Sequence, residues 1–283
     1  MWSLLDSFPE SLRFDVLDVG AALNEKPSYQ ALVEARRARI IGFEPNAAAC
    51  EQLNKTYGEP HCFYPHFIGD GNAATFHETN WSLTGSLFAP NTPLLEKFQA
   101  LAEVVTPVAT HAVSTTRLDD VAGIDNVDLF KIDVQGAELS VFRGGIRALS
   151  QTLVIQTEVE FVELYRGQPL FADVDIFLRS QGFQFHAFHS ISGRSFKPLV
   201  VNNDPNQPIR QALWADALYV RDWMRLDELS VDKLMKYAVL LHDVLASYDL
   251  AHVVLAALDR RVQGDFSPQY LARLTAATPV SPS

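Results

Sequence analysis

Short apolar runs alternate with segments of helical spacing between Phe14 and Arg221. Apolar runs without polar alternation are typical of strands buried on both faces of a parallel sheet. The pattern predicts seven main strands, at residues 14–19, 39–43, 61–68, 127–132, 152–157, 182–186 and 213–220. It predicts helices at residues 28–37 and 47–55, a helix after Gln135-Gly136 with Leu139, Phe142 and Ile146 on one face, and a helix that runs through Ser180. We therefore expect an α/β fold with an open, mostly parallel sheet.

The remaining segments extend this core at two places. Residues 73–78 and 104–113 are expected to be extended, and the Pro- and Ser/Thr-rich residues 80–97 between them predict a long loop that covers the site as a lid. From Leu226 the spacing is helical, with an apolar stripe at Leu234, Ala238, Leu241, Leu245 and Tyr248 that continues in Val253, Val254, Ala257 and Leu258. We predict one domain over residues 1–225 and a helical extension over 226–283. The extension either packs on the sheet or forms a homodimer contact.

Composition limits the function classes. The chain is 48% hydrophobic and carries a formal net charge of −11, which argues against a surface that binds a nucleic-acid backbone. Residues 238–258 are apolar but are interrupted by charged and histidine side chains, so no membrane span is expected. Two cysteines, no CxxC pair and no export signal at the first residues favour a cytoplasmic protein.

Acidic residues lie at the ends of four of the predicted strands: Asp18, Glu44, Asp133 and Glu158. The clearest case is V-D-L-F-K-I-D-V-Q-G-A-E-L at residues 127–139, where a buried strand, an acid, a small turn and a helix follow one another. An open α/β sheet presents carboxylates to ligands at this edge in the same way. The alternative is an ordinary solvated turn, with Glu138 stabilising the first turn of the next helix.

The first two strands and their helix have the order of a nucleotide-binding βαβ unit. Glu44 ends the second strand, where a carboxylate can accept hydrogen bonds from both hydroxyls of a ribose. After the first strand, Gly20 is followed by Ala21, Ala22 and Leu23, so the G-x-G-x-x-G turn of pyrophosphate-binding proteins is missing. A nucleoside ligand without phosphates, such as S-adenosylmethionine, fits this turn better. An NAD-type oxidoreductase that uses the same Glu44, and a non-catalytic ligand-binding relative, remain as alternatives.

Three motifs together resemble the FkbM-type methyltransferases, which are class I methyltransferases. They are D-V-G-A at residues 18–21, G-F-E-P-N at 42–46 and K-I-D-V-Q-G-A-E at 131–138. The resemblance covers roughly residues 14–221 and implies a Rossmann-like seven-stranded sheet. It also implies S-adenosylmethionine as the cofactor and O-methylation of a small-molecule or glycan hydroxyl. By position, Asp18, Gly20 and Ala21 would line the methionine end, Glu44 and Pro45 the ribose, and Asp70 the adenine, with Asp133 close to the cofactor.

Methyl transfer to a hydroxyl requires an aligned acceptor oxygen and a group that takes its proton. Asp133 and Glu158 are the first candidates because neighbouring strands deliver both to one edge of the sheet. Glu138 and Glu160 come next, and His189, beyond a predicted strand, is a weaker candidate. Converging carboxylates could instead hold Mg²⁺, but we favour base catalysis. Lys131 is expected to pair with a neighbouring carboxylate.

Overall fold

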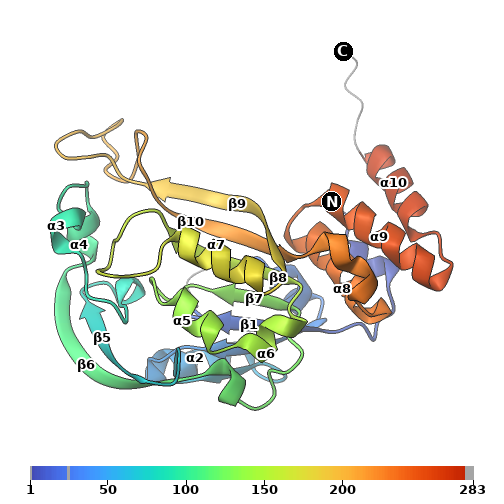
Figure 1. The fold of residues 1–283 in the computed structure, drawn as a ribbon, viewed down its shortest axis with the longest axis horizontal. Coiled ribbons are helices and arrows are strands. Elements are labelled where there is room, and N and C mark those ends of the chain that lie inside the picture. The colour runs from blue at the N-terminus through green and yellow to red at the C-terminus, as the bar shows by residue number, and fades with distance from the viewer. Residues whose placement is uncertain (1, 24–25, 278–283) are drawn as a thin grey trace.

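A seven-stranded sheet runs through the centre of the molecule, whose computed structural model describes residues 2–23 and 26–277 (Figure 1). Its strand order is β3-β2-β1-β7-β8-β10-β9, in which β10 is antiparallel to both neighbours and the other strands run parallel. The strands are β1 Phe14–Val19, β2 Ala38–Phe43, β3 Cys62–Tyr64, β7 Leu129–Ile132, β8 Val154–Glu160, β9 Phe183–Gly193 and β10 Ala212–Arg221. The chain order reverses between β1 and β7, which is where open α/β sheets bind their ligands. The predicted α/β fold with an open, mostly parallel seven-stranded sheet is confirmed.

A smaller three-stranded sheet lies beside the main one in the order β4-β6-β5. It consists of β4 Phe67–Ile68, β5 Ala73–Thr79 and β6 Pro107–Thr116, and the short helices α3 Thr92–Leu95 and α4 Leu101–Val104 lie between β5 and β6. The prediction of one strand over residues 61–68 is therefore wrong. Pro65 has no N–H for a ladder hydrogen bond, so β3 ends at Tyr64 and β4 continues into the smaller sheet.

Three helices cover one face of the main sheet: α5 Glu138–Arg143, α6 Ile146–Gln151 and α7 Phe171–Ser180. Their buried side chains, such as Phe142 and Leu178, share a core with Val19 and Phe130 of the strands. The expectation that Ile146 shares a face with Leu139 and Phe142 is wrong, because Gly144-Gly145 separates α5 from α6 and leaves Ile146 exposed.

The other face is covered by α1 Gln30–Glu34, α2 Ala47–Tyr57 and the C-terminal helices α8 Val231–Val239, α9 Tyr248–Val262 and α10 Phe266–Ala277. The first helix is shorter than the predicted 28–37, since it ends before Arg36, whose φ is +55°. Short 3-10 helices lie at Leu4–Ser7, Ser82–Thr84, Leu118–Asp120 and Trp223–Glu228, and a π-helical turn at Leu240–Val244 follows α8.

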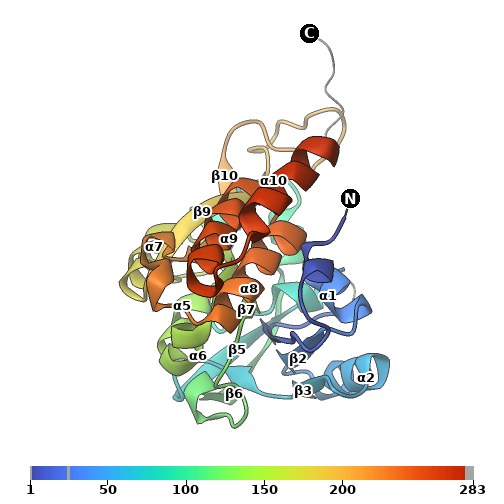
Figure 2. The ribbon, with the colours of Figure 1, turned by 90° about the vertical axis from the view of Figure 1, so that its right-hand side faces the viewer.

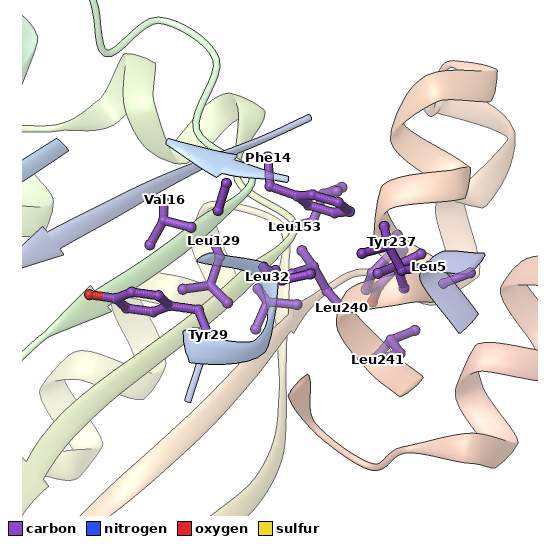
Figure 3. Packing of buried hydrophobic residues seen from close by; sticks show 14 of the residues in the cluster. Leu5, Phe14, Val16, Tyr29, Leu32, Leu129, Leu153, Tyr237, Leu240 and Leu241 are labelled. Carbon is purple, nitrogen blue, oxygen red and sulfur yellow. The ribbon is translucent and has the colours of Figure 1, made fainter. Parts of the chain in front are cut away.

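The C-terminal helices pack on the sheet. Leu240, Leu241 and Tyr237 belong to the same buried cluster as Phe14 and Val16 of β1, as Figure 3 shows. Figures 1 and 2 place these helices near the N-terminus, at the edge of the sheet away from α3 and α4. One member of the predicted stripe is wrong: Val253 is exposed, because the 3.6-residue period buries Val254, Ala257 and Leu258 instead. No helix among the described residues has the length and apolarity needed to cross a membrane.

Candidate active site

A cavity of about 990 Å³ opens at the carboxyl ends of β1, β2, β7 and β8, where the strand order reverses. Six of the predicted site residues line it, namely Gly20, Ala21, Glu44, Pro45, Asp133 and Glu158. The segment from Asn80 to Leu87 lines it too, so this part of the expected lid forms one wall. The cavity is therefore shared by the two candidate bases and most of the candidate cofactor residues.

The turn after β1 holds Asp18 and Gly20 in different surroundings. Asp18 is buried and is not part of the wall of this cavity; it accepts hydrogen bonds from the Tyr29 hydroxyl and from Lys131 Nζ at 3.4 Å. The expectation that Lys131 pairs with a carboxylate is confirmed. Asp18 therefore connects β1 to Tyr29 and Lys131 outside the cavity, while Gly20 lines the cavity itself.

Gly20 has a φ of +83°, and a Cβ atom built on it would lie 1.9 Å from the Asp133 carbonyl oxygen. A methyl group cannot occupy that position without moving either the turn or Asp133. We expect Gly20→Ala to lower the affinity for S-adenosylhomocysteine at least tenfold and to destabilise the protein by about 1–3 kcal/mol, the range for strained backbone positions. Calorimetric titration and thermal unfolding measure the two effects.

Gly123→Ala is the matched control: its φ is +86° but nothing lies within 4 Å of the added Cβ, so normal ligand affinity is expected there. An equal loss of affinity in both variants would contradict the steric argument.

Glu44 follows β2 and is oriented by its own loop. Its Oε1 accepts a hydrogen bond from the Asn46 backbone N–H at 2.7 Å, and the Asn46 side chain caps α2 through Ala49 N–H at 3.0 Å. Burial raises the pKa of the Glu44 carboxyl, and the Asn46 hydrogen bond opposes that shift. The carboxylate is therefore held at the cavity by the start of α2, beside Pro45.

Gln135 joins the two candidate bases. Its Nε2 donates to Asp133 Oδ1 at 2.8 Å and to Glu158 Oε2 at 2.8 Å, so one amide group holds both carboxylates at the same edge of the cavity. β8 continues through Glu160, so Glu158 lies inside this strand and not after it as predicted. Burial raises the pKa of Glu158 well above its usual value, and the Asp133 charge raises it further. Such a pair binds a proton more readily than an isolated carboxylate does.

Sequence reasoning did not identify Gln135 as a site residue, nor its supports Ser86 and Tyr165. Ser86 Oγ donates to the Gln135 carbonyl oxygen at 2.6 Å, and Tyr165 Oη lies 3.2 Å from Gln135 Oε1 and 2.8 Å from the Thr84 carbonyl oxygen. Gln135 also has a φ of +55°, which is uncommon for a residue other than glycine. The signal that could have indicated it is its position between the strand acid and Gly136.

Glu138 and Glu160 are buried and do not line the cavity. Glu138 Oε1 accepts from the Val134 backbone N–H at 2.9 Å, which stabilises the turn after β7. Burial raises the pKa of Glu138 to about 7. Burial also raises the pKa of Glu160 well above its usual value, followed by the effect of the Glu138 charge. The two residues therefore lie behind the Asp133–Glu158 pair and add negative potential to it.

The structure does not bring Asp70 or His189 to the cavity. Asp70 is exposed and accepts from the Asn72 backbone N–H at 3.1 Å, which stabilises the turn after β4. His189 is an exposed residue within β9, because that strand continues well past the predicted residue 186. Within residues 2–23 and 26–277, no group of three or more His, Cys, Asp or Glu side chains is arranged to hold a metal ion.

The sequence pattern of the family described as "Methyltransferase FkbM domain" matches residues 18–185, more than half of the chain. The chain belongs to the FkbM methyltransferase family. Members of this family use S-adenosylmethionine, so this is the cofactor of the chain, and the NAD-type alternative is set aside. The matched residues include the turn after β1, Glu44, Asp133 and Glu158.

The chain is similar to the 2-O-methyltransferase NoeI of Sinorhizobium fredii, with 33% identity over 180 residues that cover 57% of this chain and 70% of NoeI. Among solved structures, it is similar to a candidate methyltransferase from Thermoplasma acidophilum, with 9% identity, a TM-score of 0.37, and coverage of 74% of this chain and 68% of the other. It is also similar to the StiE O-MT structure, with 9% identity, a TM-score of 0.35, and coverage of 87% and 77%.

Proposed function

We propose that this FkbM methyltransferase methylates a hydroxyl oxygen of a sugar or a sugar-containing acceptor. The observation that carries the proposal is the pair of carboxylates, Asp133 and Glu158, joined by Gln135 at a cavity that Glu44 also lines. A hydroxyl acceptor must lose a proton as its oxygen is methylated, and this pair is the proton acceptor within the cavity. The similarity to a protein named as a 2-O-methyltransferase supports an oxygen acceptor.

The residues of the cavity fit the cofactor. Glu44 offers a carboxylate to the ribose hydroxyls, and the turn at Gly20, which packs tightly on the backbone of Asp133, lines the cavity beside it. When bound, S-adenosylmethionine supplies an electrophilic methyl group. The lid residues 80–87 and Tyr165 enclose the cavity, which excludes water and orients the acceptor for in-line attack.

The proton moves to the Asp133–Glu158 pair. Gln135 keeps the two carboxylates facing the same point, and its side chain is fixed in turn by Tyr165. Burial and the Asp133 charge raise the pKa of Glu158, so the pair accepts a proton more readily than an isolated carboxylate does. We assign proton abstraction to the Asp133–Glu158 pair as a unit, and we assign no role in contacting the substrate to Glu138 or Glu160.

Replacing Glu44 with Ala tests the cofactor side. We expect S-adenosylhomocysteine to bind about 1.5–3 kcal/mol more weakly, the range for hydrogen bonds to a charged group. Titration calorimetry on the purified chain measures the change. Glu51→Ala is the matched control, because Glu51 is an exposed residue of α2 outside the cavity wall and its replacement should leave the dissociation constant unchanged. Equal affinity in wild type and Glu44→Ala would move the ribose elsewhere.

Turnover with a hydroxylated acceptor distinguishes the enzyme from a non-catalytic relative that binds the cofactor alone. Transfer of a labelled methyl group to a panel of glycosides, followed by mass analysis, identifies the methylated atom. Methylation at nitrogen or carbon would contradict the proposal. A homodimer through the C-terminal helices, the division at residue 225 and a cytoplasmic location remain predictions that sedimentation, limited proteolysis and cell fractionation can test.

A further inference from the structure

The connection between β9 and β10 contributes Arg194 to the lining of the cavity. Arg194 follows directly after β9, and Trp214 lies in β10. Both residues line the cavity. Neither belongs to the machinery proposed above for cofactor binding or proton transfer, so their arrangement needs its own explanation.

The guanidinium of Arg194 is fixed in place by its surroundings. Its Nη1 donates to the Gly193 carbonyl oxygen at 2.8 Å, and its Cζ lies 5.1 Å from the centroid of the Trp214 ring. Its Nε is buried and, within the part of the chain that the structure describes, has no hydrogen-bond partner. An unpaired buried donor costs free energy, which a ligand with an acceptor oxygen would recover.

The charge of Arg194 is also not neutralised by direct contact with a carboxylate among the described residues. Among the described residues it forms no ion pair, whereas Lys131, the other cation of the wall, is paired with Asp18. Burial lowers the pKa of the Arg194 guanidinium, and the charge of Asp204 in the same connection opposes that shift. The chain has a net charge of −11, so a cation held in this cavity is a local exception to its overall potential.

The position of Arg194 relative to the proposed base follows from the strand register. Trp214 pairs with Glu160, and Asp216 pairs with Glu158, in the antiparallel ladder of β10 and β8. Two residues along a strand correspond to roughly 7 Å, about the span of one sugar ring. Glu158 and Arg194 line the same cavity, so an acceptor whose hydroxyl lies at Glu158 would direct a neighbouring substituent toward the guanidinium beside Trp214.

We propose that Arg194 is the specificity determinant for an acidic acceptor, one that carries a carboxylate, phosphate or sulfate group about one sugar ring away from the methylated hydroxyl. A planar guanidinium can donate two parallel hydrogen bonds to such an oxyanion. The contact with the Trp214 ring and the hydrogen bond to the Gly193 carbonyl oxygen orient the guanidinium before the acceptor binds. The inference rests on the proposed O-methylation, and it names the acceptor class of that same cavity.

The test compares acidic glycosides with their neutral parents on the full chain saturated with S-adenosylhomocysteine. The probes are methyl glucuronoside and methyl galacturonoside, glucose 6-phosphate and glucose 6-sulfate, and the corresponding uncharged methyl glycosides and glucose. Calorimetry gives the affinities, and labelled S-adenosylmethionine gives kcat/KM. We expect at least one acidic probe to bind about tenfold or more tightly than its parent, the scale of one hydrogen bond to a charged group. The acidic probe that binds more tightly than its neutral parent shows whether the oxyanion is a carboxylate, a phosphate or a sulfate.

Arg194→Met should abolish that preference while S-adenosylhomocysteine still binds normally. Arg194→Lys should keep part of the preference for acidic probes, since the positive charge remains but the planar pair of guanidinium donors is lost. Arg210→Met removes an exposed arginine of the same connection that lies outside the cavity wall, and it should keep the full preference. The inference is overturned if neutral parents bind as well as the acids, if the preference survives in Arg194→Met, or if S-adenosylhomocysteine binds and no acidic probe does. Binding of an acid without methyl transfer would instead contradict the proposed function.

Discussion

Asp133→Asn is expected to bind S-adenosylhomocysteine with near-normal affinity and to transfer methyl groups roughly 10²–10⁴-fold more slowly, the scale of a lost general base. The substitution keeps the shape of the side chain but removes its negative charge. Where Asp133 Oδ1 now accepts from Gln135 Nε2 at 2.8 Å, an asparagine can present either its oxygen or its NH₂ group. In both cases Glu158 loses the neighbouring charge that raises its pKa.

The pH profile provides a second readout of the same change. The base must be deprotonated to act, so methyl transfer in the wild type should increase as the pH rises through the raised pKa of Glu158. Because Asp133→Asn removes one cause of that shift, its remaining activity should rise at a lower pH. Asp120→Asn, which alters an exposed acid outside the cavity, is the matched control and should keep the wild-type rate and profile.

Two outcomes would contradict this assignment. If Asp133→Asn and Glu158→Gln both turn over the true acceptor at normal rates, the base lies elsewhere, and His111 is the next residue to test because it lines the cavity 2.7 Å from Glu78. If EDTA abolishes wild-type activity and Mg²⁺ restores it, the carboxylates act through a cation and not as a base.

The main sheet could be predicted because its strands are encoded locally. β1 begins and ends at the predicted residues 14 and 19, and β2 and β7 end where their apolar runs end. Strand periodicity did not predict where β3 stops, because an isolated Pro65 in an apolar run does not show which sheet the chain joins next. The sheet that the chain joins after Pro65 is decided by the pairing of β4 with β6, which is distant in the sequence.

The site was predictable to the extent that it depends on strand ends. Asp133 and Glu158 meet because β7 and β8 are parallel neighbours, which the order of elements already indicates. Gln135, Ser86 and Arg194 could not be found this way, since their roles depend on side-chain directions and on contacts between loops that are distant in the sequence. Asp70 failed to reach the cavity for a related reason: it follows β4 of the smaller sheet and not a strand of the main one.

The largest effect on stability is expected at the opposite edge of the sheet, at Asp128. This carboxylate is completely buried just before β7. Its Oδ1 accepts from Lys233 Nζ at 2.7 Å, and its Oδ2 accepts from Lys236 Nζ at 3.1 Å and from the Asp15 backbone N–H at 2.9 Å. Both lysines belong to α8, so Asp128 ties the C-terminal helices to the amino ends of β1 and β7.

Asp128→Ala should lower the free energy of unfolding by about 3–5 kcal/mol, the usual cost of removing one partner from a buried ion pair, because it leaves the buried Lys233 without a carboxylate and Lys236 with only the exposed Asp232. Urea unfolding followed by circular dichroism measures the change. Asp232→Ala is the matched control: Asp232 also pairs with Lys236, at 3.2 Å, but its side chain is 57% exposed, so a loss below about 1 kcal/mol is expected. Similar losses in the two variants would show that burial does not decide the strength of this cluster. A stable, well-folded Asp128→Ala protein would show that the apolar contacts of α8 with the sheet are enough to hold the C-terminal helices in place.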